Sequence, residues 1–281
     1  MNSILSDRIL NMEESATLAM AKKARELKAQ GIDIISLSLG EPDFKTPKHI
    51  QQAAKDAIDE GKYFAYPPVA GYQDLREAIA KKLREENNIA EAKAENIVVS
   101  VGAKHSIANT FMCIINEGDE VVIFSPYWVS YAEIIKLCGG VPVLIEGTLE
   151  NNFKATAAQL EAAITPKTKA ILINSPQNPT GAVIPRDTWL AIAQLCCEHD
   201  LWLISDEVYS SLVYEGEHIH PATLPGMAQR TATINSLSKS HAMTGWRLGW
   251  VVGPTELMTH LENLGLSMLY GCPEFIQKAA C

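Results

Sequence analysis

The stretch KAILINSPQNPTGAVIPRDTWLAIAQLCCEHDLWLISDEVY, residues 169–209, holds two short apolar runs separated by a helical pattern. The runs at 169–174 and 201–205 have the length of strands, and residues 186–200 carry apolar side chains at helical spacing. Two strands joined through a helix form a βαβ unit, in which the strands are parallel. This stretch therefore predicts an α/β fold.

The same alternation extends over most of the chain. Several runs are apolar nearly throughout, as expected when helices cover both faces of a sheet. We predict a three-layer α/β/α domain with a mostly parallel sheet. The further strand-like runs lie at 34–39, 96–100, 120–125, 141–146, 231–235 and 248–252.

The first 45 residues form a separate part of the pattern. A helix at about 15–30 and the apolar run 34–39 precede the turn Gly40-Glu41-Pro42. We therefore divide the chain into an N-terminal segment, 1–45, and a large domain, 46–281.

Composition excludes several functional classes. The chain has 47% hydrophobic and 20% charged residues, and its formal net charge is -9. Nucleic-acid binding requires clustered Lys and Arg, so a small-molecule substrate is favoured over nucleic acid. No apolar run approaches the roughly 20 residues that cross a bilayer, and no signal peptide precedes the domain. We expect a cytoplasmic protein with no membrane partner.

The six cysteines show no pattern of metal ligands or disulfides. They contain no CxxC pair and no ligand spacing with His, so we expect reduced thiols in or near the core and no metal site. The cysteines are Cys113, Cys138, Cys196, Cys197, Cys272 and Cys281.

Polar residues directly follow five of the strand-like runs, where open parallel sheets bind their ligands. Each group alone has an ordinary explanation, such as a turn, a surface acid or a solvent-facing lysine. The groups are Gly102, Ala103 and Lys104; Tyr127 and Trp128; Asn178; Asp206 and Tyr209; and Ser236, Ser238 and Lys239, with Arg247 eight positions further on.

One ligand accounts for all five groups: an aromatic, cationic heterocycle that carries a phosphate, as pyridoxal phosphate (PLP) does. Asp206 would keep a ring nitrogen protonated, and Lys239 would form a Schiff base. Asn178 and Tyr209 would bond a ring hydroxyl, while Trp128 stacks on the ring. The phosphate would bind to Ser236, Ser238, Arg247 and the helix N-terminus at Gly102, Ala103 and Lys104.

The chain resembles class I aminotransferases of the fold-type-I PLP superfamily. The resemblance rests on GEPDF (40–44), YPPVAG (66–71), NPTG (178–181), SDEVY (205–209) and SLSKSHAMTGWRLGW (236–250). It implies that the large domain binds PLP and that 1–45 belongs to an incomplete small domain. It also implies Lys239, Asp206 and Tyr209 as catalytic residues.

Further roles follow from the resemblance alone. It implies that Tyr66 reaches the phosphate of the other subunit, and hence a homodimer with shared active sites. Gly40, Trp128 and Asn178 are implied as substrate contacts.

Two parts of the chain resemble different members of this family. The first half is similar to bacterial aspartate or prephenate aminotransferases, in which residues matching Ser15, Thr17 and Lys104 face the distal carboxylate of the substrate. The second half is similar to arginine:pyruvate transaminases. Because the side-chain contacts lie in the first half, an acidic, aspartate-type substrate is favoured.

Relative to the family, the chain stops at Cys281, roughly one small domain early. The family carries there the arginine that binds the α-carboxylate of the substrate, and no arginine follows Arg247. Three alternatives therefore remain beside the aspartate-type enzyme: an arginine:pyruvate transaminase, a PLP-dependent β-lyase, and an inactive PLP-binding fragment.

Overall fold

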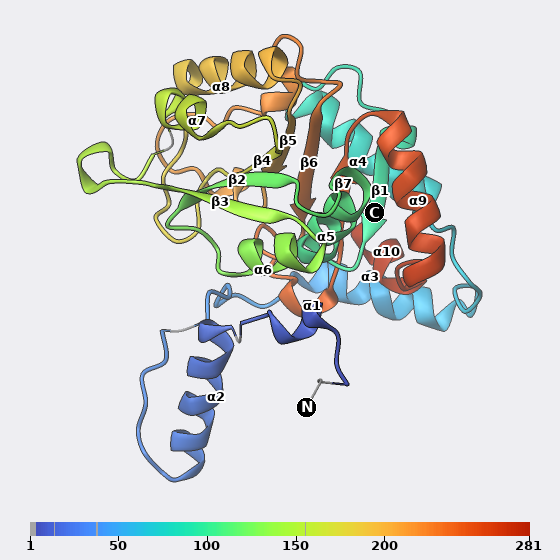
Figure 1. Cartoon of the computed structure of the whole chain (residues 1–281). Helices are drawn as coiled ribbons and strands as arrows, with labels where there is room; N and C mark the ends of the chain where they lie inside the picture. Colours follow the sequence, from blue (N-terminus) through green and yellow to red (C-terminus); the bar gives the residue numbers. More distant parts are fainter. Residues whose placement is uncertain (1–3, 14, 38, 155) are drawn as a thin grey trace.

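The computed structural model describes residues 4–13, 15–37, 39–154 and 156–281, and its centre is a seven-stranded sheet (Figure 1). The strand order is β1-β7-β6-β5-β4-β2-β3. Neighbouring strands are parallel except at β7, which is antiparallel to both β1 and β6. The strands are β1 (Ile97–Ser100), β2 (Glu120–Ser125), β3 (Val141–Glu146), β4 (Thr168–Asn174), β5 (Trp202–Asp206), β6 (Thr231–Ser236) and β7 (Gly249–Val252).

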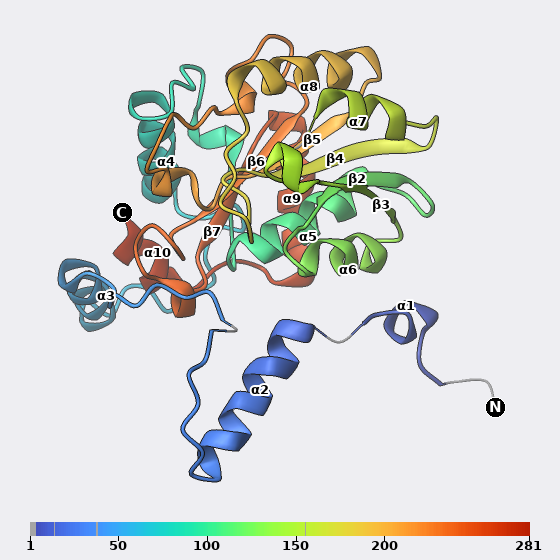
Figure 2. The same cartoon turned by 90° about the vertical axis from the view of Figure 1, so that its left-hand side faces the viewer.

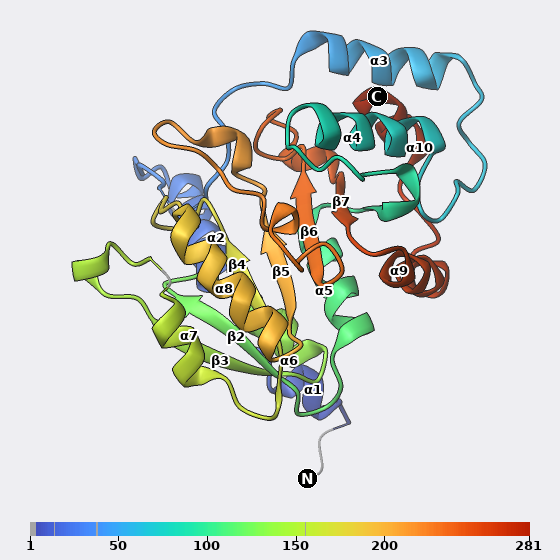
Figure 3. The ribbon, with the colours of Figure 1, turned by 90° about the horizontal axis from the view of Figure 1, so that it is seen from above.

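Helices cover both faces of this sheet, so the α/β fold class and the three layers are confirmed. Helices α5 (Ala103–Ile114), α6 (Ser130–Leu137) and α9 (Thr255–Met268) pack on one face. Helices α4 (Gln73–Glu85), α7 (Ala157–Ala163) and α8 (Arg186–Glu198) pack on the other (Figure 3).

The alternation of strand residues produces the two cores. In β2, Val121 and Ile123 belong to the core under α5 and α6, whereas Val122 and Phe124 belong to the core under α7 and α8. Successive side chains of a strand point to opposite faces, so a run that is apolar throughout buries both sides. The apolar runs of the sequence therefore mark the strands of the sheet centre.

The remaining helices lie at the margins of the layers. Helix α3 (Lys48–Asp59) lies beside α10 (Glu274–Ala280), and α1 (Asp7–Leu10) lies near α6. Helix α2 (Ala16–Ala29) stands away from the three layers (Figure 2). Short 3-10 helices occur at Ala94–Asn96, Leu149–Asn151, Ser210–Leu212, Pro221–Thr223 and Thr244–Trp246.

The strand predicted at 34–39 is wrong for its described residues. Residues 34–37 and 39 carry no strand assignment, and Ser38 lies outside the described residues. Ile35 is 87% exposed and Leu37 is 92% exposed. A strand is held by hydrogen bonds to a neighbouring strand, and none of the described residues of this run belongs to the seven-stranded sheet.

Two other features bear on the sequence expectations. The six cysteines are free thiols, and all but Cys197 and Cys281 are buried or half-buried. The end of α9 leaves Leu266 and Met268 about half exposed. In the described residues, no helix combines the length and the apolar character needed to cross a membrane.

Candidate active site at one edge of the sheet

Most of the polar residues predicted to form a site come together at one edge of the sheet. The carboxyl ends of the parallel strands meet there, and the start of β7 meets them because β7 runs in the opposite direction. Asn178 follows β4, Asp206 ends β5 and Ser236 ends β6. Arg247 reaches the same edge two residues before β7 begins.

Lys239 lies in the loop after β6 and is covered by the N-terminal segment. Its Nζ donates a hydrogen bond to the carbonyl oxygen of Gly40 at 2.5 Å and lies 5.9 Å from the ring centroid of Tyr209. Burial lowers the pKa of Lys239; the positive charge of Arg247 lowers it further, whereas Glu41 opposes the shift. A lysine with a lowered pKa is more readily the neutral amine that attacks a carbonyl carbon.

Residues 40–46 are held over this loop by a second set of contacts. The Thr46 hydroxyl donates to the carbonyl oxygen of Ala242 at 2.6 Å and accepts from Trp246 Nε1 at 3.0 Å. These bonds connect positions about 200 residues apart in the sequence. The GEPDF turn is thus fixed beside Lys239.

Asp206 is a buried carboxylate with two hydrogen-bond donors. Tyr131 donates its hydroxyl to Oδ2 at 2.6 Å, and the backbone N–H of Val208 donates to Oδ1 at 3.2 Å. Burial raises the pKa of Asp206 to about 6, although the bond from Tyr131 opposes the rise. In the described residues no Lys or Arg forms an ion pair with this carboxylate.

Asn178 and Tyr209 meet near Asp206. Asn178 Nδ2 lies 3.4 Å from the hydroxyl of Tyr209. Asn174 fixes this loop, because its Oδ1 accepts from the backbone N–H of Asn178 at 2.7 Å and its Nδ2 donates to the carbonyl oxygen of Asp206 at 2.9 Å. The ends of β4 and β5 are therefore joined through one amide side chain.

A small cradle lies between the N-terminus of α5 and Arg247. Gly102 has φ +85°, a conformation that L side chains rarely adopt, and a Cβ there would lie 2.3 Å from Arg247 Nη2. Arg247 donates to the carbonyl oxygen of Thr244 at 2.9 Å. Ser236 Oγ accepts from the backbone N–H of Ser238 at 3.3 Å. Both serines lie beside β7, the strand that follows Arg247.

The first two backbone N–H groups of α5, those of Ala103 and Lys104, precede its first hydrogen-bonded turn and have no partner within the helix. Together with the guanidinium of Arg247, they make this cradle suitable for a phosphate. Ala103 and Lys104 are the first two residues of α5.

Lys104 and Trp128 lie against each other. Lys104 Nζ is 4.8 Å from the centroid of the Trp128 ring, which in turn meets the Tyr131 ring edge-on at 5.3 Å. Burial and the charge of Arg247 lower the pKa of Lys104. This exposed cation is one of the charged groups at the edge.

Three predicted residues do not join this group in the described structure. Ser15 caps α2, where its Oγ accepts from the backbone N–H of Leu18, and Thr17 lies in the same helix. Tyr66 is 81% exposed, with its ring 4.6 Å from that of Tyr270. Their roles at the site remain predictions.

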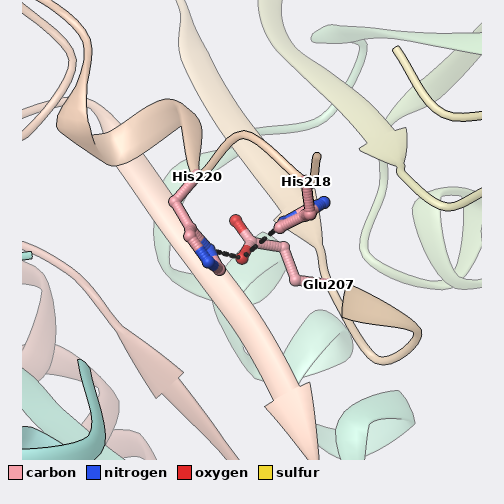
Figure 4. Close-up of side chains that lie close together, drawn as sticks. All are labelled: Glu207, His218 and His220. Carbon is pink, nitrogen blue, oxygen red and sulfur yellow. Dashed lines mark hydrogen bonds and ion pairs between the residues drawn. The ribbon is translucent and has the colours of Figure 1, made fainter. Parts of the chain in front are cut away.

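Sequence reasoning missed Tyr131, Asn174 and a cluster behind β5. Tyr131 follows the expected aromatic pair in SPYWVSY, and Asn174 ends the run KAILIN, so both stood next to recognised positions. The cluster consists of Glu207, His218 and His220 (Figure 4). The two histidines follow Glu207 by 11 and 13 positions. This spacing matches no common metal motif.

Comparisons with known proteins bear on this arrangement of residues. The profile of the family described as "Aminotransferase class I and II" matches residues 32–281. The chain is 53% identical over 252 residues to an arginine–pyruvate transaminase of Pseudomonas aeruginosa, covering 90% of this chain and 64% of the relative. It is 47% identical over 260 residues to an aspartate/prephenate aminotransferase of Thermus thermophilus, covering 92% and 66%.

Solved structures resemble the whole chain. The aspartate aminotransferase from Thermus thermophilus with maleate superposes with a TM-score of 0.94 at 44% identity, covering 100% of this chain and 72% of that structure. An aspartate aminotransferase from Rhizobium meliloti gives a TM-score of 0.93 at 39% identity, covering 99% and 70%. The chain thus spans under two thirds of the length of the first two relatives and about 70% of these structures.

Proposed function

Because this chain belongs to the class I and II aminotransferase family, we propose that it binds PLP on Lys239 and moves an amino group from an L-amino acid to a 2-oxo acid. The supporting observation is the convergence of Lys239, Asp206 and the Gly102–Arg247 cradle at one edge of the sheet. These groups match an aldehyde, a ring nitrogen and a phosphate respectively.

The residues present fit this cofactor. Asp206 is buried, and the described structure gives it no ion pair with Lys or Arg, so a protonated ring nitrogen would supply the positive charge that a buried carboxylate needs. A side chain at Gly102 would collide with Arg247, so the glycine lets the guanidinium lie against the start of α5, where both would bind a phosphate. Asn178 and Tyr209 offer donors for the ring oxygen.

The chemistry divides between the cofactor and the chain. When bound, PLP supplies an electron sink for the carbanion that forms at the substrate Cα. Asp206 keeps the ring nitrogen protonated. Lys239, whose pKa is lowered, holds the cofactor and, once released, acts as the base that takes the Cα proton. Arg247 and the start of α5 fix the phosphate end, and so orient the reacting carbon.

An acidic substrate is the first choice for side-chain specificity. Lys104 is an exposed cation at the site, and its ammonium group lies over the ring of Trp128. A second carboxylate of the substrate gains an attractive charge there, whereas a guanidinium meets a like charge. We include Ser15 and Thr17 as further contacts of that distal carboxylate.

An arginine–pyruvate transaminase is the second candidate. The observation in its favour is the 53% identity to the Pseudomonas aeruginosa protein of that name. Overall identity counts core positions and site positions alike, whereas specificity depends on the few residues that contact the substrate side chain. Lys104 therefore weighs more heavily in the choice.

We also assign residues 1–45 to a small domain and propose a homodimer in which Tyr66 contacts the phosphate of the partner subunit. The exposed ring of Tyr66 supports this proposal, since 81% of it is free to meet a second chain. Equilibrium sedimentation of wild type with PLP tests the dimer. Tyr66→Phe should retain the dimer and bind PLP more weakly.

The deciding experiment is the visible absorption of the purified chain with PLP, before and after adding aspartate or, separately, arginine. Lys239→Ala removes the proposed cofactor lysine, and Lys167→Ala, at an exposed lysine, is its matched control. We expect a band in wild type and in Lys167→Ala, no such band in Lys239→Ala, and conversion of the band by aspartate.

The other outcomes separate the alternatives. Conversion by arginine but not aspartate would replace the acidic substrate with a basic one. Release of pyruvate and ammonia without an oxo acid acceptor would indicate a β-lyase. A stable band that no amino acid converts would identify an inactive PLP-binding chain, and the absence of any band would refute the PLP proposal.

A further inference from the structure

A second polar cluster lies on the other side of β5 from Asp206. Glu207 is the next residue and is 1% exposed, and its Oε2 lies 3.2 Å from His218 Nε2 and 2.5 Å from His220 Nδ1 (Figure 4). The three ligand-type atoms all lie within 4.8 Å of one another. None of these residues takes part in the proposed PLP site.

The cluster is held in place by its neighbours. Ser205 donates its hydroxyl to Glu207 Oε1 at 2.9 Å, and Asn87 Nδ2 lies 2.6 Å from His220 Nε2. Ile219 is buried in the core under α8. In an extended segment adjacent side chains point to opposite sides, so burial of Ile219 directs both histidines toward Glu207.

The charge of Glu207 has no cationic partner among the Lys and Arg residues in the described part of the chain. Its polar neighbours among the described residues are the two imidazoles and the hydroxyl of Ser205.

The second nitrogen of each ring differs in its surroundings. Nδ1 of His218 is buried without a hydrogen-bond partner. Nε2 of His220 lies 2.6 Å from the side-chain amide of Asn87. The nitrogens that face Glu207 are therefore Nε2 of His218 and Nδ1 of His220.

We propose that Glu207, His218 and His220 form a binding site for a divalent transition-metal ion of the zinc type. Two imidazole nitrogens and one carboxylate oxygen are a common three-ligand set for such ions, and a water molecule completes the tetrahedron. Tetrahedral bonds of about 2.0–2.1 Å separate ligand atoms by roughly 3.4 Å. Glu207 Oε2 and His218 Nε2, which are 3.2 Å apart, already have this spacing. His220 Nδ1, which is 2.5 Å from Glu207 Oε2, needs to move back by about 1 Å.

The surroundings set the expected properties of the site. Ser205 and Asn87 orient Glu207 and His220, as outer residues of metal sites do. Nδ1 of His218 lacks such a partner, so affinity should be roughly 10–100-fold below that of a fully supported site. The His220 side chain remains 12% exposed, which gives an ion and its water a way in. A bound ion would join the loop before the 3-10 helix Pro221–Thr223 to the end of β5.

The test uses the full chain after treatment with a chelator, without PLP or amino acid, so its result is independent of the proposed function. Co²⁺ titration followed by visible absorption reports tetrahedral coordination, and Zn²⁺ competition with calorimetry gives stoichiometry and affinity. The variants are Glu207→Gln, His220→Asn and Ser205→Ala, with the exposed His199→Ala as the matched control. Urea unfolding confirms that each variant is folded.

We expect one ion per chain and a tetrahedral Co²⁺ spectrum that Zn²⁺ abolishes. Glu207→Gln and His220→Asn should weaken binding by more than about 100-fold and Ser205→Ala by roughly 10–100-fold, with His199→Ala unchanged. Three results would overturn the proposal: no binding by wild type, binding that His220→Asn leaves intact, or a spectrum with thiolate charge transfer, which would assign the ion to cysteines.

Discussion

Asp206→Asn should make the cofactor-free chain progressively more stable relative to wild type as pH rises toward neutrality, while it weakens PLP binding. The carboxyl of Asp206 is 3% exposed, and burial raises its pKa from 3.8 to about 6. Between these two values the folded chain binds more protons than the unfolded chain, so the free energy of unfolding falls as pH rises. A shift of about 2 pH units at 1.36 kcal/mol per unit corresponds to about 3 kcal/mol.

The assay is urea unfolding of the cofactor-free wild type and of Asp206→Asn from pH 4 to pH 8. The difference in the free energy of unfolding should move in favour of the variant by about 2 kcal/mol between pH 4 and pH 7. Asp59→Asn, at an exposed carboxylate, serves as the control. A flat difference for Asp206→Asn, or one that falls with rising pH, would refute the reasoning.

Three further predictions concern the same edge of the sheet. Tyr131→Phe removes the 2.6 Å bond to Asp206 and should cost about 1–3 kcal/mol in urea unfolding, with weaker PLP binding; an unchanged stability would contradict it. Gly102→Ala should greatly weaken PLP binding in a spectroscopic titration, whereas Gly118→Ala, at similar φ but with nothing within 4 Å, should cost stability alone. Thr46→Val loses two hydrogen bonds and should speed proteolysis within residues 30–46; equal cleavage rates would count against this anchor.

The sequence predicted the sheet well because its central strands are buried on both faces. The run at 120–125 coincides with β2, since a run that is apolar throughout can satisfy two cores at once. The run at 141–146 coincides with β3, although this edge strand leaves Val141 and Leu144 about half exposed. The run at 34–39 has the same appearance in the sequence, yet its described part is no strand. Pairing with a neighbour is a long-range property that composition does not encode.

The candidate site was predictable only where the sheet topology brings the ends of strands together. The rule that ligands bind at the carboxyl ends of parallel strands selected Asn178, Asp206 and Lys239 from a single sequence. This rule does not predict the contacts that side chains of helices make with the site. Tyr131 is the second residue of α6 and reaches Asp206 across 75 residues of sequence, so its bond required the three-dimensional structure.

Asp206 and Glu207 show how one strand end provides opposite electrostatic conditions to adjacent carboxyls. The Asp206 side chain turns toward α6, where Tyr131 and one backbone N–H are its donors, and its pKa rises to about 6. Glu207 turns to the other face, where two imidazoles and a hydroxyl donate to it, and its pKa falls to about 2. Both are buried, so the number of donors decides the direction of the shift. A cationic ligand at Asp206 therefore gains binding energy mainly by neutralising the charge, and one at Glu207 gains it mainly from the arrangement of the ligand atoms. In both proposals the cation binds to a carboxylate that forms no ion pair with a Lys or Arg of the described chain.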